Sequence, residues 1–258
     1  MVPIRTPDIL VVAAMKEELN DFKHTDAVYP LNHSSGKPDK HYWELPDHSG
    51  HIGFGVCGVG KKKASKNLSR LLKTVHPELI LLMGYSGAII PSLNVGDLVI
   101  IEKTIHESLA PDEYLSMNDR LISRCQTVFE HQGVLFSSVS AVSSDTFIDS
   151  TAEKKRLHSV FGAGCVDMES HAIARIASHH NIPILIIRVI SDLADETIGL
   201  NFSCIPAGKW AFRLYFACRP WLLPGLFRLF SNARRARRKL SNAVHIILDN
   251  QLSRSIVS

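Results

Sequence analysis

The chain has 258 residues, of which 45% are hydrophobic and 21% are charged, and its formal net charge is +4 at pH 7. These proportions are those of an ordinary soluble globular protein, and the length is sufficient to bury a full core in one α/β domain or two small ones. The five cysteines have no paired spacing and form no C-x-x-C motif, which excludes a zinc site of that kind and argues against a disulfide framework.

The N-terminal segment Met1–Asp8 lacks the charged and apolar regions of a signal peptide. Together with the unpaired cysteines, this favours a reducing, cytoplasmic location. Beyond this segment, apolar runs and helical periods predict strands and helices in turn. In chain order, we expect a strand at Asp8–Ala14, a helix from Met15, a hairpin around His41–Leu45, a strand at His51–Cys57 and a helix over Lys61–Val75.

The middle of the chain continues the same alternation. We expect a buried strand at Glu78–Met83 that ends in a turn at Gly84–Gly87, a strand at Val95–Ile101, a helix at Ser116–Gln132 and a strand at Val134–Val142. Strands that alternate with helices predict a mostly parallel sheet with helices on both faces.

The segment from Val166 to Asp195 predicts a helix, a turn at Asn181–Pro183 and a buried strand that runs out at Asp192. That strand is apolar on both faces, which is typical of a central parallel strand. Open parallel sheets bind ligands beyond the carboxyl ends of their strands, so we expect a catalytic acid at Asp192.

Four motifs occur in the order and spacing of a known enzyme family. They are Ala13–Glu18, Gly84–Gly87 with Val95–Asp97, Ser144–Ile148, and Val166–Glu169 with Val189–Asp192. Through them the sequence resembles the methylthioadenosine/adenosylhomocysteine nucleosidases of the purine nucleoside phosphorylase-type superfamily, and also its hopanoid-associated (adenosylhopane) branch. The resemblance implies a single-domain, three-layer α/β/α fold over residues 1–205 with a mostly parallel, partly barrel-like sheet. It further implies a homo-oligomer that uses no cofactor.

The resemblance implies cleavage of the N-glycosidic bond of a 5′-substituted adenosine. This reaction needs an acid that protonates the leaving base and a carboxylate that orients water against an oxocarbenium-like sugar. Burial favours the protonated form of a carboxyl group, so Asp192, at the end of an apolar strand, is the expected acid. Glu18 is the carboxylate that the resemblance assigns to the water.

By the same resemblance, seven further residues contact the substrate or support the acid. Two are assigned to the ribose, Glu169 through hydrogen bonds to its hydroxyls and Met168 through packing. Phe147 and Ile148 hold the adenine, and Ser191 supports the acid. Tyr85 and Ser86 border the sugar.

Each carboxylate taken singly has a structural interpretation that remains open. Glu18 could be a solvated helix residue, Glu169 a first-turn carboxylate favoured by the helix dipole, and Asp192 a helix N-cap. A Gly-x-Gly-x-x-Gly pattern begins at Gly53, but its glycines lie within a predicted strand, so we expect no nicotinamide cofactor. The 13 histidines include no set with ligand spacing, so we expect no metal site.

The resemblance leaves the nucleophile undecided between water and phosphate. Phosphorylases of the family hold phosphate with an arginine just before the Gly84 turn and another after the first strand, where this chain has Leu82 and acidic or neutral residues. A phosphate without a cationic partner would be poorly held, which favours water. Two alternatives stay open: phosphorolysis with a lysine from elsewhere or from a neighbouring subunit, and a non-catalytic nucleoside- or membrane-binding protein.

Residues 206–258 differ from the rest and form a basic amphipathic extension. Between Glu196 and Asp249 there are nine lysines and arginines and no acidic residue. Apolar residues from Leu223 to Ile247 recur every three or four positions and predict a helix. Three interpretations remain open: a helix that covers the core, an interfacial helix on the anionic inner face of the membrane, and a nucleic-acid contact, for which no module is recognisable.

Overall fold

The computed structural model describes residues 7–22, 42–47, 50–197 and 223–250. In chain order its elements are β1 (Ile9–Ala13), η1 (Lys16–Phe22), β2 (Tyr42–Asp47), β3 (Gly50–Val56), α1 (Lys61–Leu71), β4 (Leu79–Ala88), β5 (Leu98–His106), β6 (Leu115–Ser116), α2 (Asp119–His131), β7 (Ser137–Ser143), α3 (Thr151–Phe161), β8 (Cys165–Asp167), α4 (Ser170–His179), β9 (Ile184–Asp192) and α6 (Leu223–Asp249). The expected alternation of strands and helices is confirmed.

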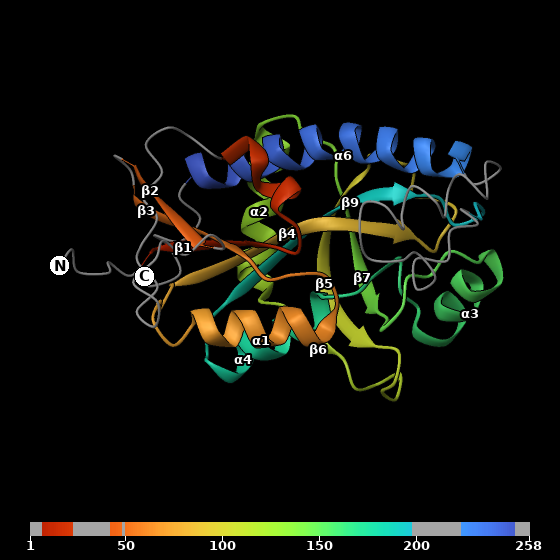
Figure 1. The fold of residues 1–258 in the computed structure, drawn as a ribbon, viewed down its shortest axis with the longest axis horizontal. Coiled ribbons are helices and arrows are strands. Elements are labelled where there is room, and N and C mark those ends of the chain that lie inside the picture. Colours follow the sequence, from red (N-terminus) through yellow and green to blue (C-terminus); the bar gives the residue numbers. More distant parts are fainter. Residues whose placement is uncertain (1–6, 23–41, 48–49, 198–222, 251–258) are drawn as a thin grey trace, which may run out of the picture.

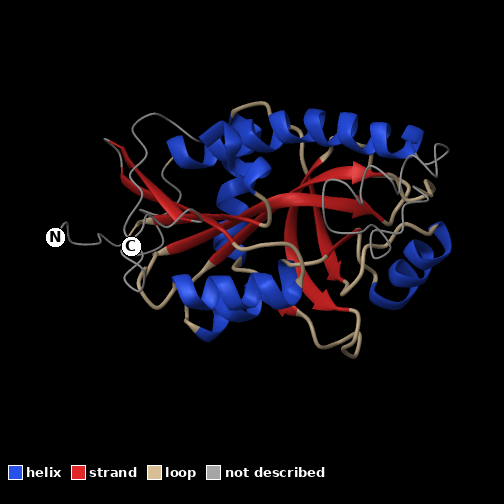
Figure 2. Ribbon diagram, viewed as in Figure 1, coloured by secondary structure: helices blue, strands red, loops and turns tan. Residues whose placement is uncertain are grey.

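One mixed sheet, drawn in red in Figure 2, runs through the molecule. Its strand order is β2-β3-β1-β4-β8-β7-β5-β6. Strand β9 pairs with both β4 and β5, so β4, β8, β7, β5 and β9 form a closed ring. Strands β1 and β3 extend the sheet in parallel from β4, and β2 forms the expected hairpin with β3. The partly barrel-like sheet predicted from the resemblance is therefore confirmed.

Helices cover this sheet on two sides (Figure 1). On one side η1 and α6 lie together, and α6 packs on β4 and β9. On the other side α1 and α4 lie together, and α4 packs on β5 and β7. Helix α3 lies near the end of the sheet toward which the arrows of β4 and β9 point. That end is where the sequence places the site.

The two central strands fix the position of the predicted acid. Strand β9 is buried along its whole length, and β4 is buried at every position but Tyr85, as expected for strands that are apolar on both faces. They pair in parallel from Ile80 opposite Ile184 to Gly87 opposite Asp192, with a register shift just before Gly87. Asp192 therefore ends a central strand, beside a glycine of its neighbour.

The turn predicted at Gly84–Gly87 is wrong, because β4 continues through these residues to Ala88. The two glycines do not reverse the chain. They allow side chains of the neighbouring strand to lie directly against the backbone of β4. A Cβ atom on Gly84 would collide with the guanidinium of Arg188, and one on Gly87 would lie 2.8 Å from Oδ2 of Asp192. Both ionisable side chains come from β9, so the glycines of β4 make room for the polar end of its partner strand.

The sequence analysis does not predict α3 or the short strands β6 and β8. The helix expected from Val166 begins only at Ser170, because Val166 and Asp167 belong to β8.

Helix α3 carries few apolar signals. Only Lys154 and Leu157 of this helix are buried, so no apolar stripe marks it in the sequence. Its ends carry ordinary signals: the Ser150 hydroxyl accepts a hydrogen bond from the Glu153 N–H, and Gly162 has the left-handed φ of 62° that glycine favours after a helix.

The helix predicted in the C-terminal extension is confirmed as α6. From residue 236 onward the apolar stripe of α6 faces the core: Ala236, Leu240, Val244 and Ile247 are buried. This part of the stripe therefore covers the sheet, as the first of the three interpretations holds. The aromatic and basic stretch at 207–222 lies outside the described residues, so the membrane-surface interpretation stays a prediction. None of the described helices is long and apolar enough to cross a membrane.

Replacing Leu240 with alanine tests the packing of α6. Leu240 is fully buried, so Leu240→Ala should lower the free energy of unfolding by about 2–5 kcal/mol. Urea denaturation followed by circular dichroism measures the change. The matched control is Asn242→Ala on the exposed side of the same turn, which should change it by less than about 0.5 kcal/mol. Equal midpoints for the two variants would contradict the packing of α6 on the core.

Candidate active site

Glu18 is buried in the first half of η1, with 2% of its surface exposed, so it is not a solvated helix residue. Its Oε2 accepts a hydrogen bond of 2.8 Å from the Met15 N–H. Burial raises the pKa of the Glu18 carboxyl to about 7, although the Met15 N–H and the Arg188 guanidinium oppose the rise. A carboxylate with this pKa can take up and release a proton near neutral pH.

Glu169 stands at the N-cap of α4 but does not cap that helix. Its Oε1 reaches across to the Gly60 N–H, 2.7 Å away at the start of α1. The capping role falls to Asp167, whose Oδ1 accepts hydrogen bonds from the backbone N–H groups of Glu169 and Ser170. Burial raises the pKa of the Glu169 carboxyl, with Arg188 opposing the rise. The helix-dipole interpretation therefore does not account for its position.

Arg188 is the first residue of the candidate site that the sequence analysis misses. It projects from the middle of β9 with 1% of its surface exposed. Its guanidinium lies 3.1 Å from Oδ2 of Asp167 and donates hydrogen bonds to the Ser170 hydroxyl. Its charge also opposes the rise that burial causes in the pKa values of Glu18 and Glu169. The available signal was a single arginine within an otherwise apolar strand, since a buried charge requires partners.

Asp192 is buried at the end of β9 and makes two close polar contacts. Its Oδ2 accepts a hydrogen bond of 2.6 Å from the ammonium of Lys154, and its Oδ1 accepts one of 2.7 Å from the Ser191 hydroxyl. The Ser191 hydroxyl also lies 3.2 Å from the carbonyl oxygen of Ser86. Residues 193–197 form no helix, so Asp192 is not the N-cap of a following one. The structure therefore brings together three predicted site residues and Lys154, which was not predicted.

The residues expected to hold the base and sugar lie on the segments that carry or adjoin these charged groups. Phe147 and Ile148 are half-buried in the loop that joins β7 to α3, and Met168 is half-buried next to Glu169. Tyr85 is the half-buried position of β4, and burial followed by the Glu18 charge raises the pKa of its hydroxyl. Ser86 is buried beside it. These places agree with a substrate that lies across the carboxyl ends of β4 and β9.

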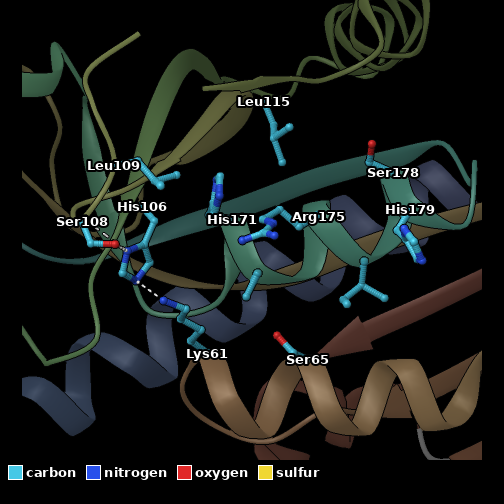
Figure 3. A pocket seen from close by; sticks show the side chains of 12 residues that line it. Lys61, Ser65, His106, Ser108, Leu109, Leu115, His171, Arg175, Ser178 and His179 are labelled. Carbon is cyan, nitrogen blue, oxygen red and sulfur yellow. Dashed lines mark hydrogen bonds between the residues drawn. The ribbon is translucent and has the colours of Figure 1, made fainter. Parts of the chain in front are cut away.

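A separate cavity of about 570 Å³ lies between α1, α4 and the segment that follows β5 (Figure 3). Its polar lining is basic and includes Lys61, His106, His171 and Arg175, without a carboxylate. None of the residues predicted for catalysis or substrate binding lines it. The predicted carboxylates are therefore gathered at the strand ends and not in this cavity.

The charges divide the predicted site into two ends. At one end Glu18, Glu169 and Asp167 surround the guanidinium of Arg188. At the other end Asp192 meets the ammonium of Lys154. Among the described residues, no group of three His, Cys, Asp or Glu side chains could hold a metal ion. The arrangement can perform proton transfer and stabilise a positive charge between its carboxylates.

Comparisons with known proteins identify the family of this chain. Residues 8–203 match the model of the family described as the phosphorylase superfamily. The chain is 30% identical over 208 residues to the 5′-methylthioadenosine/S-adenosylhomocysteine nucleosidase of Staphylococcus carnosus, an alignment that covers 75% of this chain and 90% of the relative.

Two solved structures show the same fold. The S-adenosylhomocysteine nucleosidase of Streptococcus pyogenes superposes with a TM-score of 0.71 at 18% identity, covering 96% of this chain and 98% of that one. The futalosine hydrolase of Helicobacter pylori superposes with a TM-score of 0.68 at 18% identity, covering 92% and 97%. At this identity the likeness establishes the fold alone, and the sequence match carries the assignment: the chain is an enzyme of the phosphorylase superfamily.

Proposed function

We propose that this enzyme hydrolyses the N-glycosidic bond of a 5′-substituted adenosine and releases adenine. The observation that carries the proposal is the buried Glu18, whose pKa of about 7 suits a group that accepts a proton from water at neutral pH. The nucleosidase relative from Staphylococcus carnosus supports the same reaction class.

At the sugar end, Glu18 orients the attacking water and takes its proton. The sugar becomes oxocarbenium-like as the bond breaks, and the carboxylates of Glu18 and Glu169 stabilise its positive charge. Glu169 also accepts hydrogen bonds from the ribose hydroxyls through the oxygen that does not bind Gly60. Arg188 keeps this group of carboxylates together by offsetting their mutual repulsion.

At the base end, Asp192 delivers a proton to N7 of adenine, so the base leaves as a neutral molecule. Ser191 and the close contact with Gly87 fix the carboxyl group in place. Phe147 and Ile148 hold the adenine in the loop before α3. In this proposal the acid acts on the base and the water-activating carboxylate acts on the sugar, at the two ends of the bond that breaks.

Water suits this site better than phosphate does. Arg188 is a cation that the sequence analysis did not include, but Asp167 and Ser170 already occupy its guanidinium. A phosphate dianion beside it would also meet the carboxylates of Glu18 and Glu169. Like charges at such short range disfavour binding in a buried site.

The first test is the product of the reaction with and without inorganic phosphate. The enzyme should release adenine from methylthioadenosine, adenosylhomocysteine or a lipid-linked adenosine at the same rate in phosphate-free buffer, and give the free sugar. Mass spectrometry of the products measures this. Adenine release that requires phosphate and yields a sugar 1-phosphate would establish a phosphorylase instead. Nucleoside binding without base release would establish a binding protein.

Asp192→Asn tests the acid. This variant should lower kcat for adenine release by about 10²–10⁴-fold, the range in which a general acid contributes. It also leaves the buried Lys154 without its partner, which costs about 3–5 kcal/mol of stability, so melting must be measured alongside. The double variant Asp192→Asn/Lys154→Met removes both charges and should regain stability without activity. Full activity in the single variant would refute the role of Asp192.

Glu18→Gln tests the base through pH. In the wild type, kcat/KM should rise with pH through about 7, because only the ionised Glu18 carboxyl accepts the proton of the water. The glutamine variant should lose this rise together with most of its activity. The exposed neighbour supplies the control, since Glu17→Gln should keep both the activity and the pH profile.

The same variant makes a prediction about stability. Folding raises the pKa of Glu18 from 4.5 to about 7, so the folded wild type loses stability as pH rises between these values. Glutamine has no such loss. At pH 8, Glu18→Gln should therefore be more stable than the wild type by up to on the order of 3 kcal/mol, and by much less at pH 4. Urea denaturation at the two pH values measures the difference, and a variant that is less stable at pH 8 would contradict the burial of this charge.

A further inference from the structure

We propose that Lys154 is a positioning residue of the reaction, which holds Asp192 and passes through it the proton that the leaving base takes. This inference rests on the proposed function and adds a residue to it. Lys154 belongs to none of the four motifs that carry the family resemblance, and the reaction described above does not use it.

Lys154 is completely buried, which is exceptional for a lysine. It lies on α3, where Leu157 is the other buried residue. The neighbouring Lys155 and Arg156 are exposed. A helix with so little apolar surface turned inward gains little from packing, so the buried ammonium needs another explanation than the hydrophobic effect.

The ammonium of Lys154 has three oxygen acceptors for its three N–H groups. They are Oδ2 of Asp192 at 2.6 Å, the carbonyl oxygen of Leu193 at 2.5 Å and that of Glu196 at 3.4 Å. An ammonium donates three hydrogen bonds and accepts none, so this set of partners matches the charged form. The ammonium therefore points from α3 toward the acid and the segment that follows β9.

The carboxyl group of Asp192 is held from three directions. Lys154 binds Oδ2, Ser191 binds Oδ1, and Gly87 leaves so little room that a Cβ atom there would lie 2.8 Å from Oδ2. The short contact places a proton of the Lys154 ammonium directly against this carboxyl group. The proton that Asp192 gives to the base can therefore come from Lys154.

The proton transfer balances as follows. The bond between C1′ and N9 breaks, and its electron pair stays on the purine. Asp192 begins as a carboxylate beside the Lys154 ammonium. A proton of the ammonium moves to Oδ2 and Asp192 passes it on to N7, which leaves a neutral amine and a carboxylate. The water that attacks C1′ gives its proton to Glu18. After the products leave, Lys154 regains a proton from solvent and Glu18 loses one, so the cycle consumes one water.

The alternative is that Lys154 only ties α3 to the segment after β9. A buried ion pair contributes little net stability compared with apolar residues of similar size, but removal of one partner is costly. Loss of stability therefore cannot distinguish the two roles. Dependence of the rate on the leaving group can, because a structural tie affects every substrate alike.

The experiment compares two substrates of the Lys154→Met variant. Methylthioadenosine needs a proton on its leaving base, whereas the 4-nitrophenyl glycoside of 5-methylthioribose releases 4-nitrophenolate without one. Lys154→Met should lower kcat for adenine release by about 10²–10⁴-fold and change kcat for nitrophenolate release by less than about 10-fold. The control Lys155→Met removes an exposed charge from the same helix and should leave both rates unchanged. Equal losses on the two substrates, or no loss of adenine release, would overturn the proposal.

A double-mutant cycle covers the case in which Lys154→Met folds poorly. If Lys154 acts only through Asp192, the Asp192→Asn/Lys154→Met variant releases adenine at the same rate as Asp192→Asn. A further loss in the double variant would show that Lys154 acts separately and would overturn the inference. A wild type that releases adenine from no nucleoside contradicts the proposed function itself, and the inference falls with it. An active wild type with an equally active Lys154→Met contradicts the inference alone.

Discussion

Two buried cations make this site possible, because four carboxylates cannot share the carboxyl ends of the central strands without them. Arg188 lies among Asp167, Glu18 and Glu169, and Lys154 binds Asp192. Taking a charge out of water is costly, and a nearby opposite charge offsets much of that cost. The two cations do not offset the burial of every carboxylate fully, since burial still raises the pKa of Glu18 to about 7. Glu18 can therefore exchange a proton near neutral pH.

The closed ring of strands explains why these groups stay in place. Strand β9 pairs with β4 on one side and β5 on the other, so its end cannot shift independently of either. Gly84 and Gly87 of β4 leave room for Arg188 and Asp192 directly on the neighbouring backbone. A site that rests on packed strands holds its side chains more precisely than one built on loops. Phe147 and Ile148, the proposed contacts of the base, lie in the loop before α3, and Lys154 of α3 connects that helix to the end of β9.

The sequence predicted much of the framework and several of the site positions. The apolar run before Asp192 identified a central strand, and the periodic stripe after Leu223 identified the C-terminal helix. It failed where local signals carry more than one meaning. The glycines of β4 resemble those of a turn, but they leave space for the side chains of Arg188 and Asp192. Helix α3 shows almost no apolar stripe because one of its two buried residues is a lysine. The roles of Asp192, Glu18 and the other site residues remain proposals that the described variants test.

The sequence by itself determined most of the order of strands and helices, the resemblance to the family, and the candidate carboxylates Glu18, Glu169 and Asp192, because periodicity and motif spacing are properties of the chain alone. Only the tertiary structure decided which charges meet. Glu169 reaches the Gly60 N–H, which is 109 positions earlier, and Lys154 reaches Asp192 across 38. Such pairs depend on how the strands close into a ring and where a helix returns to their ends. Burial then raises the pKa of Glu18 and Glu169, and burial exists only once the chain has folded.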